Sequence, residues 1–217
     1  ARLHSELISE ATQACRWVHE VSDEVSEALS RDSQGICAVA RSGAIASELP
    51  EIYPGDCIVV LAQSRDPGNA GTIMRTADAM GARAIVSVKG SVEASSPKVI
   101  RSSAGSVFHL PIVPADSFDE ACQALRGINA VILGTSGARG AYSLSSLMSQ
   151  ASVEGRGWLT QTHAWVFGNE AQGMSQSEMS ACDALVMIPM SGDAESLNVA
   201  SAAAMCLFAS QSARVGE

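Results

Sequence analysis

The sequence of 217 residues has few aromatic side chains: they make up only 4% of it, although hydrophobic residues overall reach 47%. A core built from this chain is therefore aliphatic and rich in alanine. The chain also lacks an apolar run of the ~20 residues that a membrane-spanning helix requires. Its longest apolar run, residues 199–209, is about half that length and carries Ser201, so we interpret it as a buried helix.

The sequence has no clustered metal or disulfide ligands. No two of its cysteines form a C-x-x-C pair, and its histidines are scattered along the chain. We therefore predict small buried thiols in a reducing cytoplasm and no metal site. The polar and charged N-terminal residues also predict that there is no secretory signal. The cysteines are Cys15, Cys37, Cys57, Cys122, Cys182 and Cys206, and the histidines are His4, His19, His109 and His163.

Positive charge is scarce overall, because the formal net charge is −9. This balance argues against a protein coated with cations for nucleic acid. The distribution is uneven, however: residues 65–101 contain six Lys and Arg side chains against three acids. Two interpretations remain open for this segment, namely a local basic surface on an acidic body or a few solvated cations.

The order of the expected elements indicates an α/β fold. Residues 3–30 are expected to be helical and 36–40 to form a short strand, with a domain boundary at 35–50. After that, strands and helices alternate, which favours a mostly parallel sheet with helices on both faces. The expected strands are 57–61, 84–88, 107–113, 130–134, 164–168 and 185–189. The expected helices are 69–81, one from Pro97 with Ser96 as its cap, 116–125, a short one opened by a capping box at 175–178, and 195–209.

Polar residues follow three of these strands at the places where open α/β sheets bind ligands. The first segment contains Asn69, Gly71 and Arg75. Asn69 is expected either to cap the helix or to bind a ligand, and Arg75 lies off the apolar stripe of that helix, where a guanidinium could grip a phosphate. The second segment, Gly168-Asn169-Glu170, ends a strand with a carboxylate that is either functional or simply a surface charge.

The third polar segment precedes the last helix and contains Ser196 and Asn198. A hydroxyl and an amide at a helix start are commonly caps, but they can also face a ligand at the positive end of the helix dipole. A fourth segment, from Gly134 to Gly140, has the spacing G-x-x-G-x-x-G, which matches neither a Rossmann fingerprint nor a Walker loop. A nicotinamide-dependent Rossmann enzyme is therefore poorly supported.

Taken together, these segments resemble the SpoU/TrmH family of the SPOUT methyltransferases. Asn69, Gly71 and Arg75 match its first motif, and residues 167–170 with Gly173 match the second. Residues 188–190 and 196–199 match the third, Ile-Pro-Met followed by Ser-Leu-Asn-Val. The segment 103–105, with Phe108 and Pro111, is also similar to the middle of the family domain. The resemblance covers roughly residues 50–217.

The resemblance implies a C-terminal trefoil knot, a homodimer and bound S-adenosyl-L-methionine. It implies methyl transfer to a ribose 2′-hydroxyl of RNA. The implied catalytic residues are Asn69, Arg75, Glu170, Ser196 and Asn198. The implied cofactor-binding residues are Thr135, Gly168, Ile188, Met190 and Leu197.

The resemblance also gives residues 1–40 and 41–217 different roles. Residues 1–40 resemble the tail of an N-terminal RNA-binding domain of the ribosomal-protein L30 type, with a linker, and residues 41–217 resemble the catalytic domain. Because such an appendage is common among the ribosomal enzymes, ribosomal RNA is favoured over transfer RNA as substrate. A transfer RNA 2′-O-methyltransferase and a non-catalytic module that binds cofactor and RNA remain the alternatives.

The expected mechanism assigns a task to each catalytic position. An arginine stays protonated at neutral pH, so we expect Arg75 to grip a neighbouring phosphate and steer the hydroxyl rather than act as a base. Asn69, Ser196 and Asn198 are expected to orient the ribose. Glu170 is expected to hold the arginine or the nucleotide.

Overall fold

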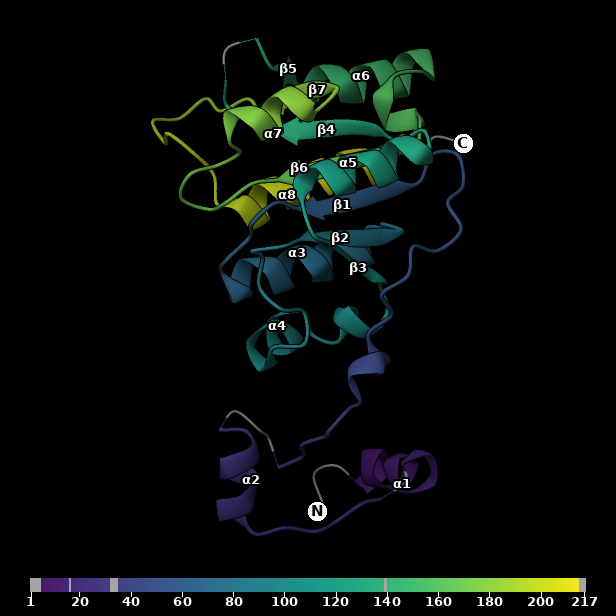
Figure 1. Cartoon of the computed structure of the whole chain (residues 1–217), viewed down its shortest axis with the longest axis vertical. Helices are drawn as coiled ribbons and strands as arrows, with labels where there is room; N and C mark the ends of the chain where they lie inside the picture. The colour runs from purple at the N-terminus through teal and green to yellow at the C-terminus, as the bar shows by residue number, and fades with distance from the viewer. Residues whose placement is uncertain (1–4, 16, 32–34, 139, 215–217) are drawn as a thin grey trace. The chain divides into compact units, whose positions relative to one another are not determined.

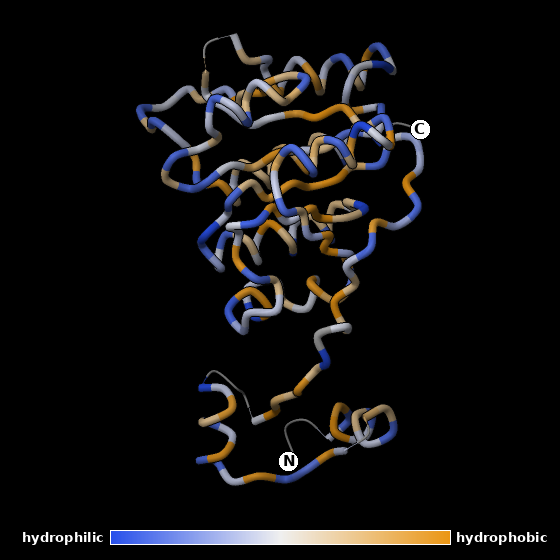
Figure 2. Tube along the Cα trace, viewed as in Figure 1, coloured by the Kyte–Doolittle hydropathy of each residue, from blue (hydrophilic) through white to orange (hydrophobic). Residues whose placement is uncertain are grey.

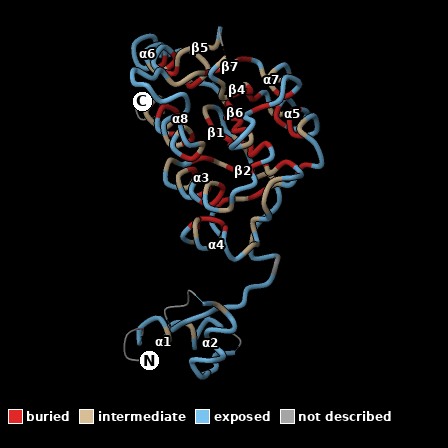
Figure 3. Tube along the Cα trace, turned by 90° about the vertical axis from the view of Figure 1, so that its left-hand side faces the viewer, coloured by how far each residue is buried: buried red, intermediate tan, exposed pale blue. Residues whose placement is uncertain are grey.

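The computed structural model describes residues 5–15, 17–31, 35–138 and 140–214. It divides the chain into two compact units, residues 1–41 and residues 42–217. The first unit contains the helices α1 (Ser5–Ala14) and α2 (Asp23–Leu29), neither of which buries a residue, as Figure 3 shows. The expected single helix over 3–30 is wrong, because Ser22 begins α2 separately by accepting a hydrogen bond from the Val25 backbone N–H. The expected strand at 36–40 is also wrong, because these residues form no regular structure.

The second unit is built on a seven-stranded sheet, in which every pairing between the described strands is parallel. The spatial order is β3-β2-β1-β6-β4-β7-β5. Because all strands point the same way, the loops that follow them lie along one edge of the sheet. The strands are β1 (Cys57–Leu61), β2 (Ala84–Val88), β3 (Ile112–Ala115), β4 (Val131–Thr135), β5 (Tyr142–Ser143), β6 (His163–Phe167) and β7 (Ala184–Met187).

Helices cover both faces of the sheet, which confirms the predicted layers (Figure 1). Alternate strand residues face opposite ways, so Val59 and Leu61 enter one core while Ile58 and Val60 enter the other. The apolar strands are the orange segments at the centre of Figure 2. The helices that pack against the first core are α3 (Pro67–Ala79), α4 (Pro97–Ser102), α6 (Leu144–Glu154) and α8 (Val199–Arg214). The second core is covered by α5 (Phe118–Gly127) and by Met179 of α7 (Gln176–Ala181).

Several element boundaries differ from those that the sequence predicts. Helix α3 begins at Pro67 because Asp66, not Asn69, is its cap. Residues 106–108 form a short 3-10 helix, η3 (Ser106–Phe108), so β3 begins only at Ile112. Two further 3-10 turns are η2 (Ser42–Ala44) and η4 (Trp158–Thr160), and α6 and β5 have no counterpart in the prediction. Cys15 and Cys37 are exposed rather than buried.

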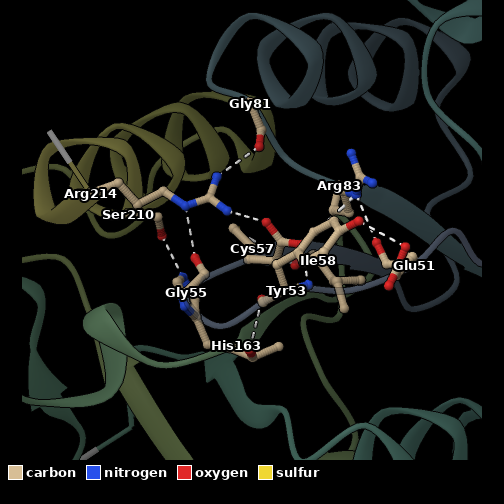
Figure 4. Close-up of polar contacts among 12 residues, drawn as sticks. Glu51, Tyr53, Gly55, Cys57, Ile58, Gly81, Arg83, His163, Ser210 and Arg214 are labelled. Carbon is tan, nitrogen blue, oxygen red and sulfur yellow. Dashed lines mark hydrogen bonds and ion pairs between the residues drawn. The ribbon is translucent and has the colours of Figure 1, made fainter.

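Polar contacts fix the C-terminal end of α8 to the amino ends of β1 and β6 (Figure 4). The Arg214 guanidinium donates to the carbonyls of Gly55, at 2.7 Å, and Gly81, at 2.9 Å, and pairs with the Asp56 carboxylate. One turn earlier, the Ser210 hydroxyl lies 2.7 Å from Nε2 of His163 and accepts from the Trp165 indole N–H at 2.8 Å. Within the described residues, no helix, α8 included, is long and apolar enough to cross a membrane.

Candidate active site

The three polar segments singled out in the sequence lie at the same edge of the sheet. The loop after β1 carries Asp66 into α3, and the loop after β6 carries Gly168 and Glu170. Strands β1 and β6 are direct neighbours in register from Cys57 and His163 to Leu61 and Phe167. Their following loops therefore start side by side. The third segment follows β7 and leads into α8, which packs against α3.

Glu170 joins the loop after β6 to the loop after β1. Its carboxylate accepts hydrogen bonds from the Ser64 hydroxyl at 2.7 Å and from the backbone N–H groups of Arg65 at 3.2 Å and Asp66 at 3.3 Å. Burial alone would raise the pKa of Glu170, but these hydrogen bonds outweigh it and lower the pKa below its usual value. The carboxylate therefore stays charged near neutral pH and acts as a fixed acceptor that holds the β1 loop.

Asn69 and Asn198 are 129 residues apart in sequence and meet in the structure. The Asn198 amide N–H donates to the side-chain oxygen of Asn69 at 3.0 Å, and the Asn198 oxygen accepts from the backbone N–H groups of Ala200 and Ser201. Asn198 thus caps α8 and contacts α3 at the same time. The backbone N–H of Asn69 donates to the Asp66 carboxylate at 2.7 Å, so contacts from two loops fix this residue.

Gly71 and Arg75 have different roles on α3. A Cβ atom at Gly71 would lie 1.9 Å from Oγ of Ser102 in α4, so only glycine permits this close approach of the two helices. Arg75 lies one turn further along α3 and is exposed. Its guanidinium makes no hydrogen bond or ion pair with any of the described residues. Gly71 therefore sets the packing of the helix, and Arg75 retains all its donors for a ligand.

The residues expected to bind the cofactor lie at or after the ends of β4, β6 and β7, and Leu197 lies just before α8. The Thr135 hydroxyl donates to the Val166 carbonyl at 2.8 Å, which ties β4 to β6. Gly168 is buried, and a Cβ there would lie 2.6 Å from the backbone of Gly173 and Met174. Ile188 is half-buried against the core. Met190 and Leu197 stay 44% and 36% exposed although both are apolar.

The sequence assigns no role of their own to two polar residues of the site, Asn169 and Ser64. Asn169 shapes the loop after β6: its side-chain oxygen accepts from the N–H groups of Ala171 and Gln172, and its amide donates to the Gln63 carbonyl at 3.1 Å. Ser64 contributes its hydroxyl to Glu170. Both residues lie beside strand ends, but only the pairing of β1 with β6 brings them to their partners. Ser196, predicted as catalytic, is exposed and has no hydrogen-bond partner among the described residues.

The edge thus combines fixed polar groups with groups still available to bind. Glu170 and Asn198 hold the loops in place. The Arg75 guanidinium and the Ser196 hydroxyl are exposed, and Met190 and Leu197 offer apolar surface. A guanidinium favours phosphate, and exposed apolar side chains favour a flat organic ring. These exposed groups can therefore bind a phosphate and the apolar part of a small molecule.

Known proteins that are similar to this chain in sequence are RNA methyltransferases. Residues 56–208 match the SpoU rRNA Methylase family. The chain is 31% identical over 215 residues to the 23S rRNA (guanosine-2′-O-)-methyltransferase RlmB of Bordetella pertussis. The aligned region covers 96% of this chain and 83% of that protein.

Solved structures agree with the sequence matches. An AdoMet-bound rRNA methyltransferase from Sinorhizobium meliloti superposes with a TM-score of 0.73 at 27% identity, covering 95% of this chain and 76% of that one. A structure described as concerning the 2-OH methylation of C/U34 on tRNA gives a TM-score of 0.62 at 28% identity, over 74% of this chain and 97% of that one. With 153 of its 217 residues inside the matched region, the chain belongs to the SpoU rRNA Methylase family.

Proposed function

We propose that this chain transfers a methyl group from S-adenosyl-L-methionine to a ribose 2′-hydroxyl of ribosomal RNA. The observation that carries the proposal is the direct contact between motifs that lie far apart in sequence. Glu170 of the second motif holds the loop that begins the first, and Asn198 of the third bonds to Asn69 of the first. The relative named as a 23S rRNA 2′-O-methyltransferase supports ribosomal RNA as the substrate.

The predicted cofactor residues fit S-adenosyl-L-methionine. The apolar side chains of Met190 and Leu197, which are 44% and 36% exposed, would contact its adenine ring. The packed loop at Gly168, where no Cβ fits, would present backbone groups to its polar edges. When bound, the cofactor supplies an electrophilic methyl group on a sulfonium.

The residues of this chain would bind and orient the RNA. Arg75 would grip a phosphate beside the target ribose with its planar guanidinium, and Ser196 and Asn69 would contact the nucleotide. Positioning of this kind contributes several kcal/mol to lowering a barrier. Glu170 is a poor candidate for the base that takes the hydroxyl proton, because its pKa is lowered and its oxygens already accept three hydrogen bonds.

The proposal also covers the fold, the assembly and the location of the protein. We infer a trefoil knot at the C-terminal end: β6 lies between β1 and β4, and β7 then lies on the other side of β4, an order that supports a threaded path. We also propose a homodimer, a cytoplasmic location and a reaction that uses no metal ion. Residues 1–40 remain proposed as the tail of an RNA-binding domain of the ribosomal-protein L30 type.

A methylation assay tests the proposal. The purified chain is incubated with tritiated S-adenosyl-L-methionine and RNA from a strain that lacks the gene, and the RNA is then separated into ribosomal and transfer fractions. We expect label in a 2′-O-methyl nucleoside of 23S rRNA. Label confined to the transfer RNA fraction would establish the alternative substrate. Cofactor binding without label in any fraction would indicate a non-catalytic module.

A further inference from the structure

The orientation of the Asn198 amide follows from its neighbours. One side-chain atom lies 2.9 Å from the backbone nitrogen of Ala200 and 3.3 Å from that of Ser201. Both nitrogens carry hydrogen and can only donate, so the atom facing them is the amide oxygen. The other atom is therefore the nitrogen, which carries two hydrogens. The usual ambiguity between the two ends of an asparagine side chain does not arise here.

The orientation of Asn69 follows in turn. The Asn198 nitrogen lies 3.0 Å from the Asn69 side chain and needs an acceptor, so it meets the oxygen of that amide. The Asn69 nitrogen is turned the other way, and none of the described residues accepts from it. Asn69 is half-buried, and its backbone is fixed by Asp66. Asn69 therefore presents its two N–H donors in a fixed direction, while its oxygen is turned toward Asn198.

We propose that Asn198 is a positioning residue that sets the Asn69 amide as a donor for a phosphate oxygen of the RNA backbone. This inference rests on the proposed function. A phosphate oxygen only accepts hydrogen bonds, so it requires the donor orientation. The exposed guanidinium of Arg75, on the same helix and without a protein partner, favours the same kind of ligand. A ribose hydroxyl, in contrast, can donate as well as accept and would tolerate either orientation of Asn69.

The substitution Asn198→Asp separates this role from the helix cap. Aspartate keeps an oxygen for the N–H groups of Ala200 and Ser201 and is as good a cap as asparagine. It replaces the donor to Asn69 by an acceptor, so the Asn69 amide should rotate and present its oxygen to the RNA. Asn69→Asp produces the same change directly, because its carboxylate still accepts from Asn198. Asn129→Asp is a matched control, since Asn129 is exposed just before β4, at the opposite edge of the sheet.

The test measures the affinity of each variant for an unmodified 23S rRNA transcript, the KM and kcat of methylation, the affinity for S-adenosyl-L-methionine and Tm. For Asn198→Asp and Asn69→Asp we expect RNA affinity to fall and KM to rise about tenfold. Cofactor affinity should stay within about twofold and Tm within about 2 °C, and Asn129→Asp should match the wild type.

Wild-type RNA affinity in Asn198→Asp would overturn the inference and indicate a hydroxyl or no ligand at Asn69. If Asn198→Asp lowers Tm strongly, Asn69→Asp decides, because it does not alter the α8 cap: wild-type RNA affinity in Asn69→Asp then overturns the inference. A wild-type chain that binds RNA but never methylates it would refute the proposed function, while the affinity measurements would still decide the role of Asn198.

Discussion

Polar side chains at the sheet edge divide into those that bond to the protein and those that do not. Glu170 accepts three hydrogen bonds from the β1 loop, and Asn198 caps α8 and bonds to Asn69. Arg75 and Ser196 are exposed and have no partner among the described residues. The first pair therefore shapes the site, and the second pair is available to substrate.

Arg75 provides a direct test of the proposed site. Replacing it by lysine or alanine should lower kcat/KM for RNA methylation by about 100-fold, because a lysine ammonium cannot reproduce bidentate contact with a phosphate. Binding of S-adenosyl-L-methionine, followed by calorimetry, should not change. Arg156→Lys is the control, since Arg156 is exposed and pairs only with Glu154 among the described residues. Normal turnover in Arg75→Ala would refute the role.

At the scale of elements, the position of α3 depends on one close contact and on both ends of α8. Gly71 lets α3 approach Ser102, whose hydroxyl oxygen lies 2.8 Å from the Pro67 carbonyl oxygen in the first turn of α3. Asn198 connects the start of α8 to α3, and Arg214 fixes the other end of α8. The helix that carries Asn69 and Arg75 is thus held from two sides.

The contact between α3 and α4 should not tolerate a methyl group. Gly71→Ala places a Cβ 1.9 Å from Oγ of Ser102, the last residue of α4, and 2.8 Å from the backbone nitrogen of its C-cap, Ser103. We expect a loss of about 1–3 kcal/mol in the free energy of unfolding, measured by denaturant titration. Gly127→Ala is the matched control, because no atom lies within 4 Å of the added methyl group there. Equal stability of the two variants would show that α3 and α4 do not pack as described.

Arg214 should contribute strongly to holding α8. Arg214→Ala removes hydrogen bonds to two backbone carbonyls and the ion pair with the mostly buried Asp56. Among the described residues, the Asp56 carboxylate then keeps the Tyr53 backbone N–H, at 2.8 Å, and the more distant cation Arg83, at 3.8 Å. We expect a loss of about 2–4 kcal/mol in the free energy of unfolding. Hydrogen exchange should show faster opening of the last turns of α8 than of α5. Unchanged exchange in α8 would mean that the helix is held by its apolar face alone.

At the scale of the whole molecule, a histidine couples folding to pH. His163 is the first residue of β6, where it is fully buried and its ring contacts Ser210 of α8. Burial lowers its pKa to about 4 from the usual 6.5. Between these values the unfolded chain binds a proton that the folded protein does not. The free energy of unfolding therefore falls as the pH falls from about 6.5 to 4, and above 6.5 this group contributes no pH dependence.

The expected loss from His163 over this range is about 3 kcal/mol. This contribution is the difference between the wild type and His163→Gln in the pH dependence of the denaturant midpoint, measured between pH 4 and 8. The carboxylates with lowered pKa values, such as Glu170, contribute to both proteins and cancel in the difference. The variant should lose less stability than the wild type on acidification. Parallel curves would mean that His163 becomes protonated while the protein is folded.

The sequence by itself determined the α/β class, the apolar strands and the family. Apolar runs of the right length mark buried strands, and the three motifs identify the SpoU relatives because their spacing is specific. Local capping was also predictable at Ser96 and at the Ser175–Glu178 box, since such bonds span only a few residues. The cap of α3 was misplaced, because Asp66 and Asn69 are equally good caps in sequence.

Only the tertiary structure decided what the site residues contact. Asn69 meets Asn198 across 129 residues, and Glu170 meets Ser64 across 106, because the sheet order places β6 beside β1 and α8 beside α3. Strand order is set by the packing of two whole layers of helices, which no local pattern records. For the same reason, the sequence could name Asn69, Asn198 and Glu170 but could not tell which of them hold the site together and which remain free to bind.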